Sequence, residues 1–198
     1  VAFFLAVPRM DDAEVAGKAP LLIVGGSRES RGVVCSASYE TRKYGVRSAM
    51  SIAHALRLCP QATCVPVPRR ACGIKSREIR SVLERFSPVV EGASIDEWYL
   101  DLGGTEDLYR GDTLADTARR IRAAVHAETR LSVSIGGGTA KLVAKLAVER
   151  AKPKPGTGAT GVLVVESGEE ADFLRGFTLA ELPLVGPPFQ ERPWVLDE

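Results

Sequence analysis

The sequence has few of the residues that build disulfide frameworks or zinc sites. Its 198 residues include four cysteines, at positions 35, 59, 64 and 72, and two histidines. The cysteines form no Cys-x-x-Cys pair, and no histidine completes a zinc set with them. We therefore expect reduced, buried thiols, which favour an intracellular, cytoplasmic protein.

Long apolar runs are also missing. No stretch of the sequence approaches the ~20 apolar residues that a membrane-spanning helix needs, so no membrane contact is expected. The apolar segment at residues 1–7 has no basic flank and no cleavage signature, which argues against a signal peptide. The sequence also has neither a P-loop nor a dinucleotide-binding fingerprint.

A strong charge of either sign is absent as well. The sequence has 26 basic and 25 acidic residues and a formal net charge of +1. A surface that binds nucleic acid must therefore come from local clustering of charge and not from a global field. The apolar and charged fractions are ordinary for a soluble globular protein, and the length allows one large domain or two small ones.

Two adjacent carboxylates, Asp96 and Glu97, interrupt an apolar, β-prone segment at residues 94–104. Neighbouring residues of a regular strand point to opposite faces, so both side chains can reach one ion only at a hairpin tip or a bulge. Carboxylates at such a bend suit Mg²⁺, which prefers oxygen ligands. The alternative is a solvated hairpin tip with two surface acids, and this segment taken alone favours it.

Patterning along the chain predicts alternating strands and helices. Residues 1–7 form a strand, or the end of one that runs into a helix. Further strands are expected at 20–24, 32–37, 62–67, 131–135 and 161–165, and helices at 39–44, 51–58, 69–86, 113–129 and 139–150. The glycines at 136–138 are expected to turn the chain into the last helix, with Thr139 as its N-cap and with backbone N–H groups that can cradle phosphate.

Three segments, at residues 38–50, 94–104 and 134–147, resemble motifs of the Y-family (translesion) DNA polymerases in their order and rough spacing. The resemblance covers most of residues 1–165. It implies an α+β fold: a ferredoxin-like polymerase palm on an antiparallel sheet, with a small inserted fingers domain and a partial helical thumb. The implied boundaries are residues 1–3 and 69–165 for the palm, 4–68 for the fingers and 166–198 for an incomplete thumb.

The resemblance also assigns roles to single residues. It implies that Asp96 and Glu97 bind two Mg²⁺ ions and that Lys141 acts with them in catalysis. The implied nucleotide contacts are Phe4, Val33, Cys35, Tyr39, Arg42 and Lys141.

The chemistry of these residue types suits the implied roles. The guanidinium of Arg42 can fork onto phosphate oxygens, and the phenol of Tyr39 can donate a hydrogen bond; three residues apart on a helix, they share one face. Phe4 matches the aromatic that the family uses to reject a 2′-hydroxyl. The small side chains of Val33 and Cys35 suit a tolerant contact with the replicating base.

The sequence departs from the family at several positions. Val1 stands where the second aspartate of the family's Asp-x-Asp-x-Phe-Phe signature is expected, so the first, a metal ligand, falls before residue 1. Ala140 replaces the usual asparagine, and Leu184 replaces the first glycine of the thumb hairpin. The little-finger domain has no counterpart. Impaired activity is therefore expected from this chain.

The function that the resemblance implies is error-prone, lesion-bypass DNA synthesis by two-metal nucleotidyl transfer. Its partners would be primer–template DNA, a deoxynucleoside triphosphate and a sliding clamp that is contacted through regions outside this sequence. Two alternatives remain open. One is a non-catalytic, polymerase-like accessory protein of a DNA-repair complex, and the other is a nucleotide cyclase.

Overall fold

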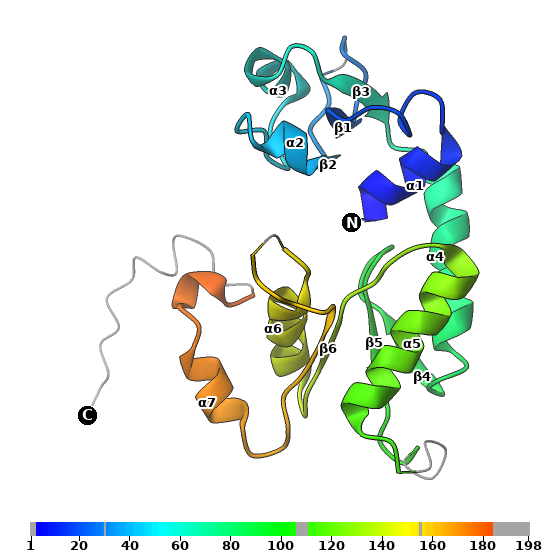
Figure 1. Ribbon diagram of the computed structural model, residues 1–198, viewed down its shortest axis with the longest axis vertical. Coiled ribbons are helices and arrows are strands. Elements are labelled where there is room, and N and C mark those ends of the chain that lie inside the picture. Colours follow the sequence, from blue (N-terminus) through cyan, green and yellow to red (C-terminus); the bar gives the residue numbers. More distant parts are fainter. Residues whose placement is uncertain (1–2, 30, 106–110, 155, 184–198) are drawn as a thin grey trace. The chain divides into compact units, whose positions relative to one another are not determined.

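The computed structural model describes residues 3–29, 31–105, 111–154 and 156–183. They form helices and three small sheets, so the predicted α+β class is confirmed (Figure 1). The chain divides into two compact units. The first unit lies within residues 1–101 and 127–132, and the second unit lies within 102–126 and 133–198.

A three-stranded sheet forms one core of the first unit. Strand β1 (Leu22–Gly25) lies between β2 (Ser36–Ala37), which is antiparallel to it, and β3 (Thr63–Pro66), which is parallel to it. The side chains of β1 from Leu22 to Val24 are all buried, as expected for an apolar central strand. Helices α2 (Tyr39–Arg42) and α3 (Ile52–Leu58) follow β2. The buried residues of this cluster are Ile23, Val34, Ala37, Val46, Ile52, Ala55, Cys59 and Ala62.

Two longer helices complete the helical part of the first unit. Helix α1 spans Phe3–Asp11. From Phe3 onward, the segment predicted as a strand or as the start of a helix is therefore a helix. Its Leu5 packs against Leu22 and Val24 of β1 in a second buried cluster. Helix α4 (Arg69–Leu83) contacts α1 and buries Cys72, Ile79, Val82 and Leu83.

A β-hairpin follows α4 in the same unit. Strands β4 (Val89–Gly92) and β5 (Trp98–Asp101) are antiparallel, with Gly92 opposite Trp98, and residues 93–97 form the loop between them. The buried Ser87 lies at the open end of the hairpin, where its hydroxyl is within hydrogen-bonding distance of the carbonyl oxygens of Val89 on β4, at 2.9 Å, and of Asp101 on β5.

In the second unit, helix α6 (Lys141–Ala151) connects two parallel strands, β6 (Ile135–Gly137) and β7 (Val162–Val164). The prediction of a wholly antiparallel palm sheet is therefore wrong for this pair, since a helical crossover returns the chain in the same direction. The strand predicted at 131–135 begins only at Ile135. Helix α5 (Leu114–Thr129) precedes β6, while α7 (Glu170–Arg175) and a 3-10 turn (Leu179–Glu181) follow β7.

The glycines at 136–138 allow close packing, and the predicted turn is wrong. Gly136 and Gly137 belong to β6, and a Cβ on Gly136 would lie 2.2 Å from the carbonyl oxygen of Ala144 in α6. A Cβ on Gly138 would lie 2.6 Å from Val143 Cγ1. Helix α6 thus lies directly against the strand backbone (Figure 1), a contact that only glycine permits.

The predicted N-cap of α6 is also wrong. The N-cap is Ala140, which makes no side-chain capping bond, and the hydroxyl of Thr139 donates elsewhere, to Glu170. Thr139 lies one residue before the cap position, because the helix begins only at Lys141.

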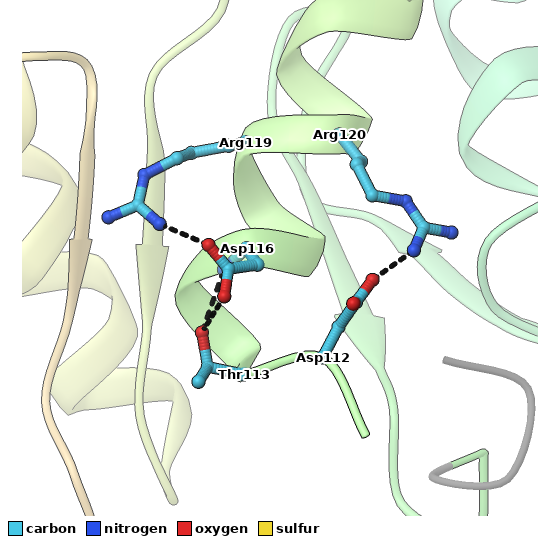
Figure 2. A network of polar contacts seen from close by, with 5 residues as sticks. All are labelled: Asp112, Thr113, Asp116, Arg119 and Arg120. Carbon is cyan, nitrogen blue, oxygen red and sulfur yellow. Dashed lines mark hydrogen bonds and ion pairs between the residues drawn. The ribbon is translucent and has the colours of Figure 1, made fainter. Parts of the chain in front are cut away.

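A polar network stabilises the start of α5 (Figure 2). The Thr113 hydroxyl accepts from the Asp116 N–H at 3.1 Å and donates to the Asp116 carboxylate at 2.6 Å, and Arg119 donates to the same carboxylate at 2.6 Å. Arg120 pairs with Asp112. A negative charge at a helix N-terminus is stabilised by the helix dipole, so the network favours a helix that begins here.

Among the residues that the structure describes, none of the helices has the length and apolar character to cross a bilayer.

Candidate active site

The structure places Asp96 and Glu97 in the hairpin loop between β4 and β5, outside the regular strands. The Glu97 carbonyl oxygen accepts hydrogen bonds from the N–H groups of Ala93, at 2.9 Å, and Ser94, at 3.2 Å, which tightens the loop. The Ser94 hydroxyl donates to Asp96 Oδ1 at 2.9 Å. This short loop therefore presents two adjacent carboxylates, with that of Asp96 oriented by a serine.

The electrostatics of this loop extend to α4. Burial raises the pKa of the Cys72 thiol, and the negative charges of Asp11 and Asp96 raise that pKa further. Asp96 therefore lies within electrostatic range of Cys72 in the first turn of α4, and so does Asp11 of α1. Sequence analysis did not associate Cys72 or Asp11 with the pair, because only the packing of α1, α4 and the hairpin brings them near.

The oxygen donors of the loop fit a hard divalent cation, which carboxylates bind well. Over the described ranges, no group of three or more histidine, cysteine, aspartate or glutamate side chains is arranged to hold a metal. The candidate pair, Asp96 and Glu97, thus offers two carboxylate side chains.

Buried Ser38 positions the two phosphate-contact candidates on α2. Its hydroxyl donates to the Pro20 carbonyl oxygen at 2.8 Å and accepts from the N–H groups of Leu22, at 3.2 Å, and Thr41, at 3.3 Å. The serine thereby caps α2 and fixes the helix to β1. This arrangement is local in origin, because a serine before a helical segment is a common N-cap.

Tyr39 and Arg42 lie on this short helix. The Tyr39 side chain is exposed, and that of Arg42 is half-buried with its Nε donating to the Ala37 carbonyl oxygen at 2.9 Å. The guanidinium of Arg47 donates to the Arg42 carbonyl oxygen at 2.9 Å. The Arg42 guanidinium is thus held through its Nε, and the Arg42 carbonyl is held by Arg47.

Val33 and Cys35 are exposed and flank the buried Val34. Val34 is fixed by backbone bonds to Ala49 and Met50, both 2.8 Å long, and alternation along extended backbone places its two neighbours on the opposite face. The prediction of buried thiols is therefore wrong for Cys35. It holds for Cys59 and Cys72; burial raises the pKa of both thiols and that of the half-buried Cys64.

Phe4 lies in the first turn of α1 and is half-buried. Its ring meets that of Phe3 edge to face, with centroids 5.4 Å apart. All of the predicted site residues except Lys141 belong to the first unit.

Lys141 is the first residue of α6 and is exposed, in the second unit. Two residues before it, the Thr139 hydroxyl donates to Glu170 Oε1 at 2.6 Å, and the Gly168 N–H donates to Glu170 Oε2 at 2.7 Å. The bond from Thr139 is the main cause of a lowered pKa for Glu170. The sequence gives no local signal for Glu170, because nothing marks a residue 31 positions along the chain as a partner of Thr139.

A family profile and curated relatives match most of this chain. The family profile described as "IMS: impB/mucB/samB family" matches residues 1–149. DNA polymerase IV of Dehalococcoides mccartyi is 39% identical over 185 residues, which cover 93% of this chain and 45% of that protein. DNA polymerase IV of Treponema denticola is 37% identical over 191 residues, covering 96% and 46%. The chain spans about half the length of these curated relatives.

Solved structures agree with the sequence comparisons. The insertion ternary complex of Dbh DNA polymerase and the crystal structure of DinB from Sulfolobus solfataricus each superpose with a TM-score of 0.78. Each is 29% identical, and the match covers 94% of this chain and 52% of the other.

Proposed function

Because the chain belongs to the impB/mucB/samB (IMS) family of Y-family DNA polymerases, we propose that it forms the palm and fingers of an error-prone, lesion-bypass DNA polymerase. The reaction would add a deoxynucleoside triphosphate to a primer 3′-hydroxyl, opposite a template base. We assign residues 1–3 and 69–165 to the palm, 4–68 to the fingers and 166–198 to the start of the thumb. The thumb prediction at Leu184 lies outside the described residues.

In this proposal Asp96 and Glu97 are the metal ligands. Two Mg²⁺ ions, when bound there, would supply charge neutralisation of the triphosphate and activation of the primer hydroxyl. The contribution of the protein is to present both carboxylates from one short loop, with the Ser94 hydroxyl fixing the orientation of Asp96.

Tyr39, Arg42 and Lys141 would bind and orient the triphosphate. Arg42 offers a planar fork for two phosphate oxygens, while Lys141 offers a compact charge at the start of α6. Because phosphoryl transfer depends mostly on positioning and on electrostatic stabilisation, these residues are expected to affect both affinity and rate.

The remaining candidates would select the nucleotide. Phe4 would pack under the sugar and exclude a 2′-hydroxyl, and Val33 and Cys35 would line the side of the replicating base. The partners are primer–template DNA and a deoxynucleoside triphosphate. A sliding clamp, contacted through regions outside this sequence, is part of the same proposal, as is a cytoplasmic location.

The observation that carries the proposal is the Asp96–Glu97 pair in the hairpin loop, within the part of the chain that the family profile matches. The test is single-nucleotide incorporation on a primer–template with Mg²⁺. We expect templated incorporation that Asp96→Asn lowers by on the order of 10²-fold or more, since it removes a charged ligand from a site that works by electrostatics. Asp101→Asn, a carboxylate on β5 of the same hairpin, is the matched control and should stay near the parent rate.

In this proposal the metal site needs three carboxylates. A polypeptide of residues 1–198 supplies two of them, Asp96 and Glu97, so we expect it to synthesise DNA slowly. Efficient synthesis by that polypeptide would refute the expected impairment. Nucleotide binding with no templated incorporation in any divalent metal would favour the accessory-protein alternative, and a cyclic-nucleotide product would favour the cyclase.

A further inference from the structure

Helix α7 is packed onto α6 and β7 within the second unit. Val143 and Ala147 of α6 form a buried cluster with Val165, and Phe173 of α7 packs against that cluster. This apolar contact brings the first turn of α7 to the segment that leads from β6 into α6.

Glu170, in that first turn, is hydrogen-bonded through both carboxylate oxygens. Oε1 accepts from the Thr139 hydroxyl at 2.6 Å, and Oε2 accepts from the Gly168 N–H at 2.7 Å. These donors lower the pKa of Glu170, so the acceptor is an ionised carboxylate at neutral pH, and bonds to charged acceptors are the stronger ones.

The segment that Glu170 holds leads directly to Lys141. Thr139 precedes the N-cap Ala140, which has no side-chain capping bond. Gly136 and Gly138 fix the strand side of the connection by their close contact with α6. The bond between Thr139 and Glu170 adds a side-chain restraint at the point where Lys141 begins the helix.

We propose that Glu170 is a positioning residue for Lys141: by holding Thr139, it orients the start of α6 so that the lysine meets the nucleotide triphosphate. The inference rests on the proposed function and adds to it a residue that does not touch the substrate. Its carboxylate is itself an anion, so a direct effect on a triphosphate would be repulsive, whereas the positioning effect is favourable to binding. Removing the carboxylate would therefore tighten nucleotide binding if the direct repulsion dominates, and weaken it if the positioning effect dominates.

The experiment measures the affinity of the whole chain for a fluorescent deoxynucleoside triphosphate in Mg²⁺, with thermal melting of each variant as a check of folding. Glu170→Ala and Thr139→Val should each weaken binding by roughly threefold to tenfold, the range expected for a lost bond to a charged group that acts through a neighbour. The double variant should be no weaker than either single one, because both remove the same contact. Glu170→Gln keeps an acceptor for Thr139 and should bind nearly as well as the parent.

Two further comparisons make the test specific. Glu169→Ala removes the adjacent carboxylate, which makes no side-chain capping bond, and should leave the affinity unchanged. In a Lys141→Ala background, Glu170→Ala should cause no additional loss, a result that a general loss of stability would not give.

Four outcomes overturn the proposal. Tighter binding by Glu170→Ala would show that the direct repulsion dominates. An additional loss in the Lys141→Ala background would show that Glu170 does not act through the lysine. If Lys141→Ala weakens binding while Glu170→Ala and Thr139→Val do not, the positioning role is wrong and the proposed function stands. If the parent chain binds no nucleotide, the proposed function and the positioning role are both wrong.

Discussion

At the scale of single residues, the four thiols differ in their burial. Cys35, which with Val33 is a proposed base contact, is exposed. Burial raises the pKa values of the other three thiols, those of Cys59, Cys64 and Cys72. A thiol reacts with an alkylating reagent only when it is both accessible and ionised. Reactivity therefore reports on the accessibility of the Val33–Cys35 face.

We predict that a maleimide modifies Cys35 at least about tenfold faster than the other three cysteines at neutral pH. Peptide mass spectrometry over a time course would measure the four rates. Bound deoxynucleoside triphosphate with Mg²⁺ should slow the reaction at Cys35 alone. The control is Cys35→Ser, which should remove the fast phase; equal rates at Cys35 and Cys72 would contradict the assignment.

Arg42 gives a second prediction at this scale. Arg42→Lys keeps a positive charge but loses the planar fork and the Nε bond to Ala37, so nucleotide affinity should fall by about tenfold. Titration with a fluorescent nucleotide would measure it. Lys43→Ala removes the next, exposed cation and should change affinity little, so an equal loss in both variants would show that only general charge matters.

At the scale of elements, the packing of α6 on β6 depends on a missing side chain. A Cβ on Gly136 would lie 2.2 Å from the Ala144 carbonyl oxygen and 2.3 Å from the Val148 nitrogen, both backbone atoms. Neither atom can rotate away, so any side chain at this position must displace the helix that carries Lys141.

Gly136→Ala is therefore predicted to lower the free energy of unfolding by about 1–3 kcal/mol or more, the usual cost of overpacking. Urea unfolding followed by circular dichroism would measure it. Gly73→Ala in α4 is the opposite control: its nearest neighbour to a Cβ is the Arg77 guanidinium at 3.6 Å, and alanine should stabilise that helix by up to about 1 kcal/mol. Equal effects of the two substitutions would contradict the packing account.

The polar network at the start of α5 predicts a dependence on pH. Hydrogen bonds from Thr113 and the charge of Arg119 lower the pKa of Asp116 below its ordinary value. A carboxyl whose pKa is lowered by folding stabilises the folded state above its unfolded pKa of ~3.9, and that contribution is lost as the pH falls through the lower folded value. Acid should therefore weaken the start of this helix.

Unfolding measured between pH 7 and pH 2 would test this prediction. Asp116→Asn should make the acid part of the stability curve shallower, since asparagine cannot titrate. Glu166→Gln, an exposed carboxylate outside the network, should leave the slope unchanged. A slope that is the same in the parent and in Asp116→Asn would contradict the assignment.

Local sequence signals account for much of the fold. The apolar periodicity at residues 69–86 and 113–129 corresponds to α4 and α5, and the segment at 161–165 contains β7. Ser38 and Ser51 cap α2 and α3, as short polar residues before helical segments do. The two adjacent charges of Asp96 and Glu97 predicted a bend in an otherwise apolar segment, whereas their metal-binding role came from the resemblance to the family.

The features that the sequence did not reveal depend on contacts between distant residues. A glycine run indicates a turn when it is considered alone, whereas Gly136 is required by a helix that comes later in the chain. Thr139 has the residue type of an N-cap, but the helix begins one residue later than predicted, and the Thr139 hydroxyl donates to Glu170. The exposure of Cys35 follows from the burial of its neighbour Val34, which is decided by the bonds of Val34 to Ala49 and Met50.

At the scale of the whole molecule, the residues of the proposed function belong to both units. Asp96, Glu97, Tyr39 and Arg42 belong to the first unit and Lys141 to the second. The central claim is that nucleotide binding by this chain depends on Mg²⁺, on the Asp96–Glu97 pair and on Lys141. A test of that claim must detect nucleotide at Lys141 and show whether substitution of Asp96 abolishes it.

An acyl phosphate derivative of a deoxynucleoside triphosphate meets that need, because it acylates a lysine that lies beside its phosphates. Mass spectrometry of the labelled chain would show which lysines react, with Lys145, one turn further along α6, as the internal comparison. We predict labelling of Lys141 that requires Mg²⁺ and is lost in Asp96→Asn and Glu97→Gln. If Lys141 is not labelled, or if its labelling depends neither on the metal nor on the two carboxylates, the central claim is contradicted.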